Sequence, residues 1–445
     1  MMKLVCLCLQ LLVAISAWSQ TGAQTIVNSS GTTGESQMQT PPPVSGEAYS
    51  TTVGSQVRSN YLRFGWSMNS AYSDNILGDA GSKPVSDASY TIWPTIAIDE
   101  VTSRMRWTLD YSPGFTVYQH TNSFDHVDQN MALDFHYRLS PHITASVRDT
   151  LHKVSNALNQ PDPLSDGGIS GLPQAPTTAV FATAANQISN QGSVELTYQF
   201  SRNGMLGAAG SSTILHYFDR AQVPGLYDST SSGSSVFYNH RLSERQYAGA
   251  NYQYLRILAD PDNSLSLTHT HSLLFFYTIY VKPHLSFSVS AGPQHFDVVE
   301  LSYMAYRGWS PAVTASMGWQ GRRTSFAASY AQLVSAGGGL ADAFKSKSAS
   351  GSASWQLARS WQVGSGASYG INKSVGPSTS SSNLGGHSIL GTVAVQHPLS
   401  EHLNVEVGYT RLHQSYSVIP LISSAPDCNR EFVTISYQFA RPLGR

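Results

Sequence analysis

The sequence is poor in charge, in cysteine and in long apolar runs. Only 12% of its 445 residues are Asp, Glu, Lys or Arg, about half the share of a typical soluble domain. The net charge is −1, which leaves no basic surface of the kind that binds nucleic acid. Of the three cysteines, Cys6 and Cys8 lie in an apolar N-terminal stretch. Without that stretch only Cys428 remains, which excludes an intramolecular disulfide and a thiolate metal cluster.

The first residues have the features of a secretory signal. Lys3 supplies a positive charge, residues 4–15 are mostly apolar, and Ala17-Trp18-Ser19 fits a cleavage site. We therefore expect a signal peptide over residues 1–19. Residues 20–58 are rich in Ser, Thr, Gly, Gln and Pro, which predicts a flexible periplasmic leader. After the signal no run of about 18 apolar residues occurs, so no transmembrane helix is expected.

The chain is instead rich in aromatic residues and in alternation with period two. Residues 131–139, 194–200, 403–410 and 433–439 alternate between apolar and polar side chains. Successive residues of a strand point to opposite faces, so each stretch has one apolar and one polar face. Strands of about ten residues match the tilted spans of a membrane barrel, and aromatic residues near their ends match its interfacial girdles. A membrane barrel is therefore favoured over a soluble sandwich.

A recurring phrase joins these stretches. Tyr-Arg-Leu-Ser-Pro-His begins at residue 137, His-Arg-Leu-Ser-Glu-Arg at residue 240 and His-Pro-Leu-Ser-Glu-His at residue 397. Each leads from one alternating stretch through turn-forming residues into another. Turns of this kind lie near Ser103-Arg104, Ser140-Pro141, Arg202-Asn203, Ser243-Glu244, Lys282-Pro283, Gly321-Arg322, Arg359-Ser360 and Ser400-Glu401. These eight turns predict 18 strands; 16 strands remain an alternative because Gly and Ala blur the pattern over residues 204–215.

The expected fold is thus an all-β transmembrane antiparallel β-barrel over residues 59–445, with short periplasmic turns and long extracellular loops. The longest loop is expected at residues 156–191, and others near residues 75–86, 219–235 and 373–386. Such a barrel belongs in the outer membrane of a Gram-negative-type bacterium, with outer-membrane lipid and the barrel assembly machinery as partners. A barrel of 16 to 18 strands leaves an aqueous channel.

Tyr72-Ser73-Asp74-Asn75-Ile76 resembles a Tyr-x-Asp-Asn-Ile phrase that closes the first strand of many outer-membrane β-barrel proteins. This loose group includes porin-like barrels and barrels from exopolysaccharide-secretion loci. Residues 104–118 and 134–147 resemble the second hairpins of the group, so the resemblance covers residues 61–445. It implies passage of solutes or polymer across the outer membrane. The C-terminus departs from the group, whose chains usually end on an aromatic residue, because Ala-Arg-Pro-Leu-Gly-Arg follows Phe439 here.

The polar faces of the expected strands carry the candidate functional residues. Parity along the strands directs one group of charged and polar side chains into the lumen: Arg106, Asp110, Asp134, His136, Arg138, Arg148 and Glu195. Opposite charges on neighbouring strands brace a barrel wall or set the field of a channel, and both interpretations stay open. Asp149 breaks the pattern because it falls on the apolar face of its strand.

The sequence indicates neither an enzyme nor a cofactor. No His-Glu-x-x-His zinc motif occurs. His269 and His271 share a strand face that could ligate a metal, but without a nearby carboxylate or cysteine, packed or solvated histidines are favoured. The leading functional hypothesis is porin-like passage of small hydrophilic solutes. The alternatives are a barrel for exopolysaccharide export and a barrel scaffold with an adhesive or enzymatic extracellular loop.

Overall fold

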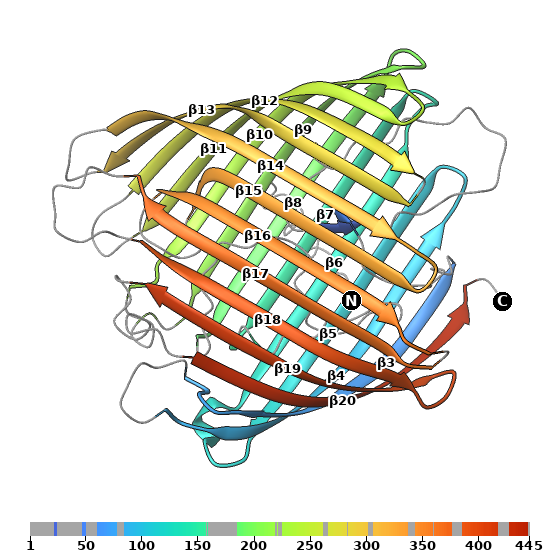
Figure 1. Ribbon diagram of the computed structural model, residues 1–445, viewed down its shortest axis with the longest axis vertical. Coiled ribbons are helices and arrows are strands. Elements are labelled where there is room, and N and C mark those ends of the chain that lie inside the picture. Colours follow the sequence, from blue (N-terminus) through green and yellow to red (C-terminus); the bar gives the residue numbers. More distant parts are fainter. Residues whose placement is uncertain are drawn as a thin grey trace, which may run out of the picture.

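The computed structural model describes residues 22–24, 47–49, 60–77, 84–156, 158, 185–218, 220, 225–260, 266–282, 284–300, 306–336, 343–358, 360–375, 385–416 and 427–443. Strands β3 to β20 form one closed antiparallel barrel (Figure 1). Each strand pairs with its neighbours in sequence, and β20 pairs with β3 to close the sheet. The prediction of 18 strands is confirmed. The 16-strand alternative is wrong, because the blurred stretch forms a complete strand, β9 (Gly204–Tyr217).

The strands of the barrel are long enough to cross a bilayer at a tilt. Their remaining bounds are β3 Tyr61–Ser73, β4 Asp87–Val101, β5 Met105–Tyr118, β6 His126–Arg138, β7 Ile143–Val154, β8 Gln187–Gln199, β10 Asp228–Ser243, β11 Gln246–Asp260, β12 Ser266–Lys282, β13 Leu285–Glu300, β14 Tyr306–Gln320, β15 Thr324–Ala336, β16 Ala343–Gln356, β17 Gln362–Ser374, β18 Gly385–Pro398, β19 Leu403–Tyr416 and β20 Asp427–Pro442. One 3-10 turn, Asn122–Phe124, lies between β5 and β6. Among the described residues, no helix is long and apolar enough to span a membrane.

The repeated phrase forms the short turns, as predicted. In the turn between β6 and β7, the hydroxyl of Ser140 accepts hydrogen bonds from the backbone N–H groups of His142 (3.2 Å) and Ile143 (3.0 Å). Ser400 accepts the equivalent bonds from His402 (3.3 Å) and Leu403 (3.2 Å) between β18 and β19. A serine hydroxyl that satisfies turn N–H groups stabilises a tight connection. The phrase therefore recurs because the same turn chemistry is needed repeatedly.

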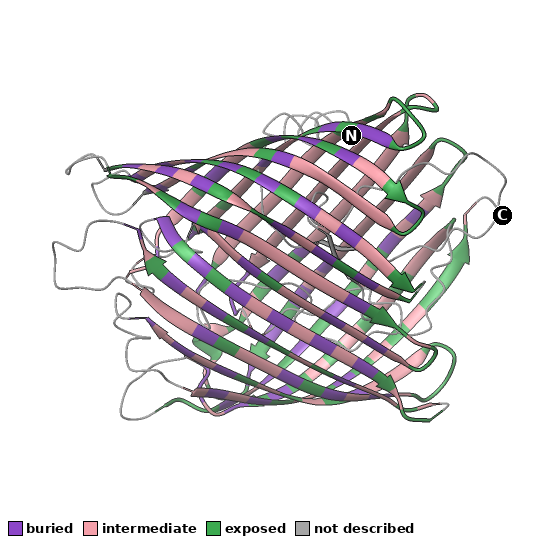
Figure 2. Cartoon of the chain, turned by 45° about the horizontal axis from the view of Figure 1, so that its top comes forward, coloured by how far each residue is buried: buried purple, intermediate pink, exposed green. Residues whose placement is uncertain are grey.

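The two faces of the wall differ in polarity. On β20, Val433, Ile435, Tyr437 and Phe439 are exposed on the outer face, whereas Thr434 points the other way and is buried. Figure 2 shows this alternation of exposed and covered residues along the strands. Aromatic rings continue across the closing seam, where Phe64 stacks on Phe439 and Trp66 on Tyr437. An outward apolar face with rings near the strand ends suits contact with lipid.

Glycines on the inner face accept aromatic rings from neighbouring strands. Trp93 on β4 covers Gly114 on β5, where an added Cβ would lie 2.4 Å from the ring. On β9, Gly207 is covered in the same way by Phe237 of β10. The glycines that blurred the sequence pattern of β9 therefore include one that is required for packing.

Gly114→Ala is expected to destabilise the barrel by about 1–3 kcal/mol, because the new methyl overlaps a ring that is enclosed by its neighbours. Gly210→Ala is the matched control, since a Cβ there would meet no atom within 4 Å. The measurement is urea-induced unfolding in lipid vesicles. Equal losses for both variants would contradict the packing role of Gly114.

The Tyr-x-Asp-Asn-Ile phrase closes the barrel. The carboxylate of Asp74 accepts hydrogen bonds from the backbone N–H (2.7 Å) and side-chain amide (2.6 Å) of Asn429, just beyond the last β3–β20 pair. The backbone N–H of Asp74 donates in return to the carbonyl of Asn429 at 3.1 Å. The next two residues of the phrase, Asn75 and Ile76, are buried. The phrase thus joins the first barrel strand to the last.

The signal peptide predicted at residues 1–19 and most of the leader predicted at residues 20–58 lie outside the described residues. Within the leader, β1 (Gly22–Gln24) and β2 (Glu47–Tyr49) pair in parallel. β2 lies near β14 and β15, and Figure 1 shows the small blue sheet within the outline of the barrel. Most of the predicted loop at residues 156–191, and parts of the other three predicted loops, are also outside the described residues.

Candidate functional site

Charged side chains gather on the inner face of β5 to β8. Asp134 forms an ion pair with Arg148 of the adjacent strand (Nε–Oδ2 3.3 Å) and another with His136 (Nε2–Oδ1 2.7 Å). Asp134 and Arg148 are direct partners in the β6–β7 register. Arg106 on β5 contributes a further positive charge beside Asp134. This arrangement concentrates opposite charges on one part of the wall.

The remaining candidate residues lie around this cluster or at its margin. Asp110 and Glu195 share the inner face with the cluster, and their cross-strand partners are Ala132 and Ser146. Arg138 has the same parity as Asp134 and His136, but it does not join their ion pairs. Its side chain is at the end of β6, where Nη2 donates to the carbonyl of Ser103 in the β4–β5 turn at 2.6 Å. Arg138 therefore lies at the rim, bonded to the β4–β5 turn, and outside the cluster around Asp134, which lies in the short-turn half of the wall.

Further charged residues on the inner face were not singled out from the sequence: Arg63, Asp99, Glu406 and Arg430. Each has the parity of buried polar neighbours on its own strand, so the alternation contained the necessary signal. We refer to the charged inner face of β3 to β8 as the charged sector. It includes Arg63 and Asp99, whereas Glu406 on β19 and Arg430 on β20 lie beside it.

Arg430 links the wall to the segment that follows β7. Its guanidinium donates to the side-chain oxygen of Asn69 (3.2 Å) on β3 and to the backbone carbonyl of Leu158. Nearby, the side-chain amide of Asn156 donates to the hydroxyl of Tyr118 at 3.3 Å. Because Asn156 and Leu158 come after β7, the chain here turns inward and reaches β5, β3 and β20. These contacts place Asn156 and Leu158 against the inner face at the long-loop end of the barrel.

The opposite part of the wall is neutral. Away from the strand ends, the described inner face of β12 to β17 carries hydroxyl, amide and apolar side chains. Serines occupy alternate positions on two of these strands: Ser286, Ser288 and Ser290 on β13, and Ser346, Ser348, Ser350, Ser352 and Ser354 on β16. We call this face the hydroxyl sector. In the strand order it lies half a turn away from the charged sector, so the two sectors face each other across the lumen.

Two unusual features of the outer face have local explanations. Asp149 does lie on the outer face, where Asn190 donates a hydrogen bond to its carboxylate at 2.9 Å. His269 and His271 also face outward and hydrogen-bond the hydroxyls of Tyr254 (2.7 Å) and Tyr252 (2.8 Å). Within the described residues, no group of three His, Cys, Asp or Glu side chains has the arrangement of a metal site.

A Gly-x-Ser-x-Gly sequence occurs at Gly366-Ala367-Ser368-Tyr369-Gly370. In hydrolases this motif forms a sharp turn between a strand and a helix, which exposes the nucleophilic serine. Here it runs straight through β17, and Ser368 is buried opposite Ser350. The local structure is therefore that of a barrel strand, unlike a nucleophile turn.

The closed 18-stranded barrel, its apolar outer face and its polar inner face define a bacterial outer-membrane β-barrel. No family model matches the chain, and no curated protein matches it.

Several solved barrels resemble the chain at low sequence identity. Acinetobacter baumannii OccAB4 is 10% identical, with 86% of this chain and 99% of that chain covered and a TM-score of 0.41. Pseudomonas aeruginosa OccK2 (OpdF) is 9% identical, with 86% and 98% covered and a TM-score of 0.43. The ferric citrate transporter FecA is 9% identical at a TM-score of 0.41. This match covers 87% of the present chain but only 65% of FecA.

Proposed function

We propose that this barrel is an outer-membrane channel for small hydrophilic solutes. The observation that carries the proposal is the two-sided inner wall, with the charged sector opposite the hydroxyl sector. Fixed charges on a low-dielectric wall attract and orient ions and dipoles. The serines of the hydroxyl sector are buried in the opposite wall, so they make that side of the barrel polar and uncharged without themselves contacting a solute. A wall of this kind suits polar solutes of modest size.

The contact between Arg430 and Leu158 supports a small solute in preference to a polymer. It brings the segment after β7 against β20 and β3, and a segment held there would reduce the free cross-section of the mouth. Export of exopolysaccharide is the second candidate function, because a polar wall without fixed charge would also suit a neutral sugar chain. Substituting Arg430 tests the choice: Arg430→Ala should raise single-channel conductance if this contact narrows the path. An unchanged conductance would remove the argument against a polymer.

Ion selectivity tests the role of the charged sector. Arg148→Ala removes the positive partner of Asp134, so the wall becomes more negative and should favour cations. In a planar bilayer with a KCl gradient, the reversal potential should shift toward cation preference. The shift should shrink as ionic strength rises, because the Debye length falls from about 10 Å at 0.1 M to about 3 Å at 1 M.

Arg138→Ala is the matched control, since it removes the same charge from the rim. Its effect on the reversal potential should be clearly smaller than that of Arg148→Ala. Equal shifts would contradict a selectivity role for the cluster around Asp134. Folded wild-type protein with no conductance at all would contradict the proposed channel.

A further inference from the structure

The seam between β14 and β15 is paired over only part of its length. The register runs from Gln320↔Ser325 near the short turn to Val313↔Gln332. Beyond that point β14 continues to Tyr306 and β15 to Ala336, yet the two strands no longer pair. Two other ladders are also interrupted near a proline, the β4–β5 ladder near Pro94 and the β12–β13 ladder near Pro293. Both resume beyond the proline. Among the described strands, this seam therefore has an unusually long unpaired end.

Pro311 explains where the pairing stops. Its carbonyl accepts a hydrogen bond from the side-chain amide of Gln332 at 3.4 Å, so this edge of Pro311 faces β15. The N–H and C=O of a strand residue point to the same side, and proline has no N–H to give. The carbonyl of Val334 on β15 therefore lacks the N–H donor that another residue at position 311 would supply, and the Pro311 carbonyl is bonded by the Gln332 side chain.

A side chain from β13 takes the place of that partner. The carboxamide oxygen of Gln294 accepts the backbone N–H of Val334 at 2.8 Å, and its nitrogen donates to the Val334 carbonyl at 3.3 Å. Gln294 is only 4% exposed. Backbone groups within a membrane must be satisfied by protein, and here one amide satisfies both groups. At this point a side-chain connection replaces the continuous backbone ladder.

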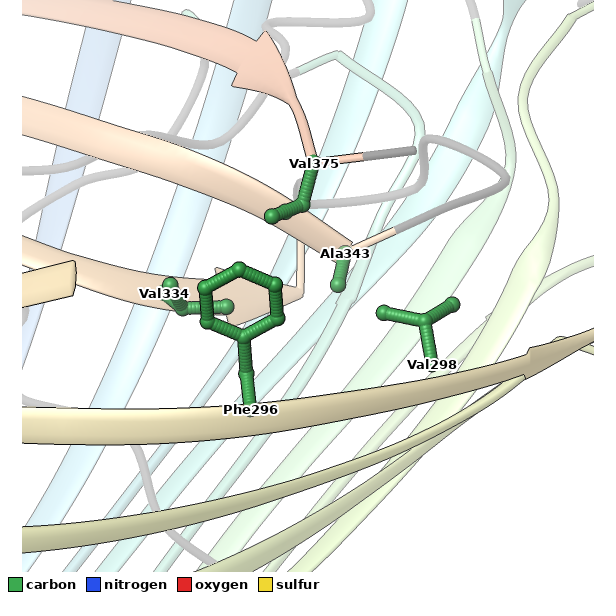
Figure 3. Packing of buried hydrophobic residues seen from close by; sticks show 5 residues of the cluster. All are labelled: Phe296, Val298, Val334, Ala343 and Val375. Atoms are coloured by element: carbon green, nitrogen blue, oxygen red, sulfur yellow. The ribbon is translucent and has the colours of Figure 1, made fainter. Parts of the chain in front are cut away.

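The wall overlaps itself at the same place. Phe296 and Val298 have the parity of the inner-face serines of β13, whereas Val334, Ala343 and Val375 have the parity of the outer-face residues of β15, β16 and the end of β17. These five residues nonetheless form one buried apolar cluster (Figure 3). The inner face of β13 therefore lies over the outer face of β15 to β17. The exposed residue Lys345 marks the outer edge, with its ammonium 5.6 Å from the Phe296 ring.

The inner side of the seam is polar. Ser335 on β15 donates to Ser346 on β16 at 3.0 Å, and the Ser346 hydroxyl donates to the Asn372 side chain on β17 at 2.7 Å. A path through the seam would thus run from hydroxyl and amide groups inside, past an apolar overlap, to the lipid. Its two ends match the head group and the hydrocarbon chain of an amphipathic molecule.

We propose that the β14–β15 seam is a lateral gate, through which an amphipathic molecule with an acyl chain passes between the lumen and the membrane. Release of Val334 by Gln294 opens the gate, and the apolar overlap of β13 on β15 to β17 closes it. With the short turns on the periplasmic side, the gate lies in the outer leaflet. This function is separate from axial passage of hydrophilic solutes.

The test is photo-cross-linking in proteoliposomes, with dodecanoic acid that carries a diazirine near the end of its chain. Cross-links are expected at the overlap residues Phe296 and Val334 and on the inner side at Ser335 or Ser346. Gln294→Ala should increase them several-fold. A disulfide between Ala312→Cys and Leu333→Cys, the first positions beyond the paired part, should abolish the inner cross-links. The same pair with the disulfide reduced should restore them.

A second disulfide, between Ser316→Cys and Ser329→Cys, crosses the paired part of the same seam and should leave the inner cross-links unchanged. Conductance for small ions should persist in both locked proteins, which distinguishes this proposal from axial passage. If Gln294→Ala does not fold, the comparison of inner cross-links between the two disulfide-locked proteins still tests the gate. Inner cross-links that are absent from the wild type, or that persist when the unpaired end is locked, would overturn the proposal.

Discussion

Val407→Arg is expected to lower the free energy of unfolding by ~2–4 kcal/mol, because a guanidinium on the lipid face near the bilayer midplane loses its hydration. Val407 is the fifth of the fourteen residues of β19, is 53% exposed, and has Val395 and Val433 as cross-strand neighbours. Leu133→Arg on β6 should have a similar effect, because Leu133 also lies on the outer face in mid-strand. Reversible urea unfolding in vesicles measures both changes.

Thr197→Arg on the inner face is the control for these variants. The Thr197 hydroxyl makes one long hydrogen bond, of 3.3 Å, to the carbonyl of Thr144. An arginine there can extend into the aqueous lumen, so its cost should be much smaller. If this variant were as unstable as Val407→Arg, the lumen would not be aqueous at that level or the two faces would be wrongly assigned.

Thiol labelling in intact cells should separate the two ends of the barrel almost completely. Ser140→Cys and Ser400→Cys lie in short turns and should resist a membrane-impermeant maleimide. Ser123→Cys lies in the exposed turn between β5 and β6, at the opposite end, and should label fully. The physical reason is that the outer membrane excludes the reagent from the periplasm. Permeabilised cells provide the control, since all three positions should then react. Equal labelling in intact cells would reverse or abolish the predicted orientation.

The strands and short turns could be predicted because their signals are local. Alternation requires only that neighbouring residues face opposite sides, and the turn serine bonds to N–H groups two and three residues ahead. β9 was the difficult strand for a non-local reason. Gly207 interrupts its pattern, but the residue that fills the space is Phe237 on the next strand. A single strand read alone cannot show this.

The site was less predictable because its contacts join distant parts of the chain. Parity alone groups Arg138 with Arg148, but the carbonyl of Ser103 holds Arg138 at the rim. The contact of Arg430 with Leu158 spans most of the barrel sequence. The prolines at positions 293 and 311 are visible in the sequence, yet nothing local indicates that Gln294 would complete the backbone of Val334. Asp149 was correctly placed on the outer face, and only the fold supplies its partner, Asn190.

The contact between Asp74 and Asn429 also sets the order in which the molecule can be completed. These residues are 355 positions apart, so the closing seam cannot form until the last strand is in place. The loss of chain entropy does not prevent a contact between residues so far apart in sequence, because each doubling of loop length adds only about 0.6 kcal/mol to the cost of closing the loop. Until β3 and β20 pair, however, the sheet of an inserting chain has two edge strands, one of which is always β3. The unpaired backbone groups of an edge strand can pair with strands of other molecules. The half-assembled barrel is therefore the species most exposed to aggregation, and rapid final closure protects it.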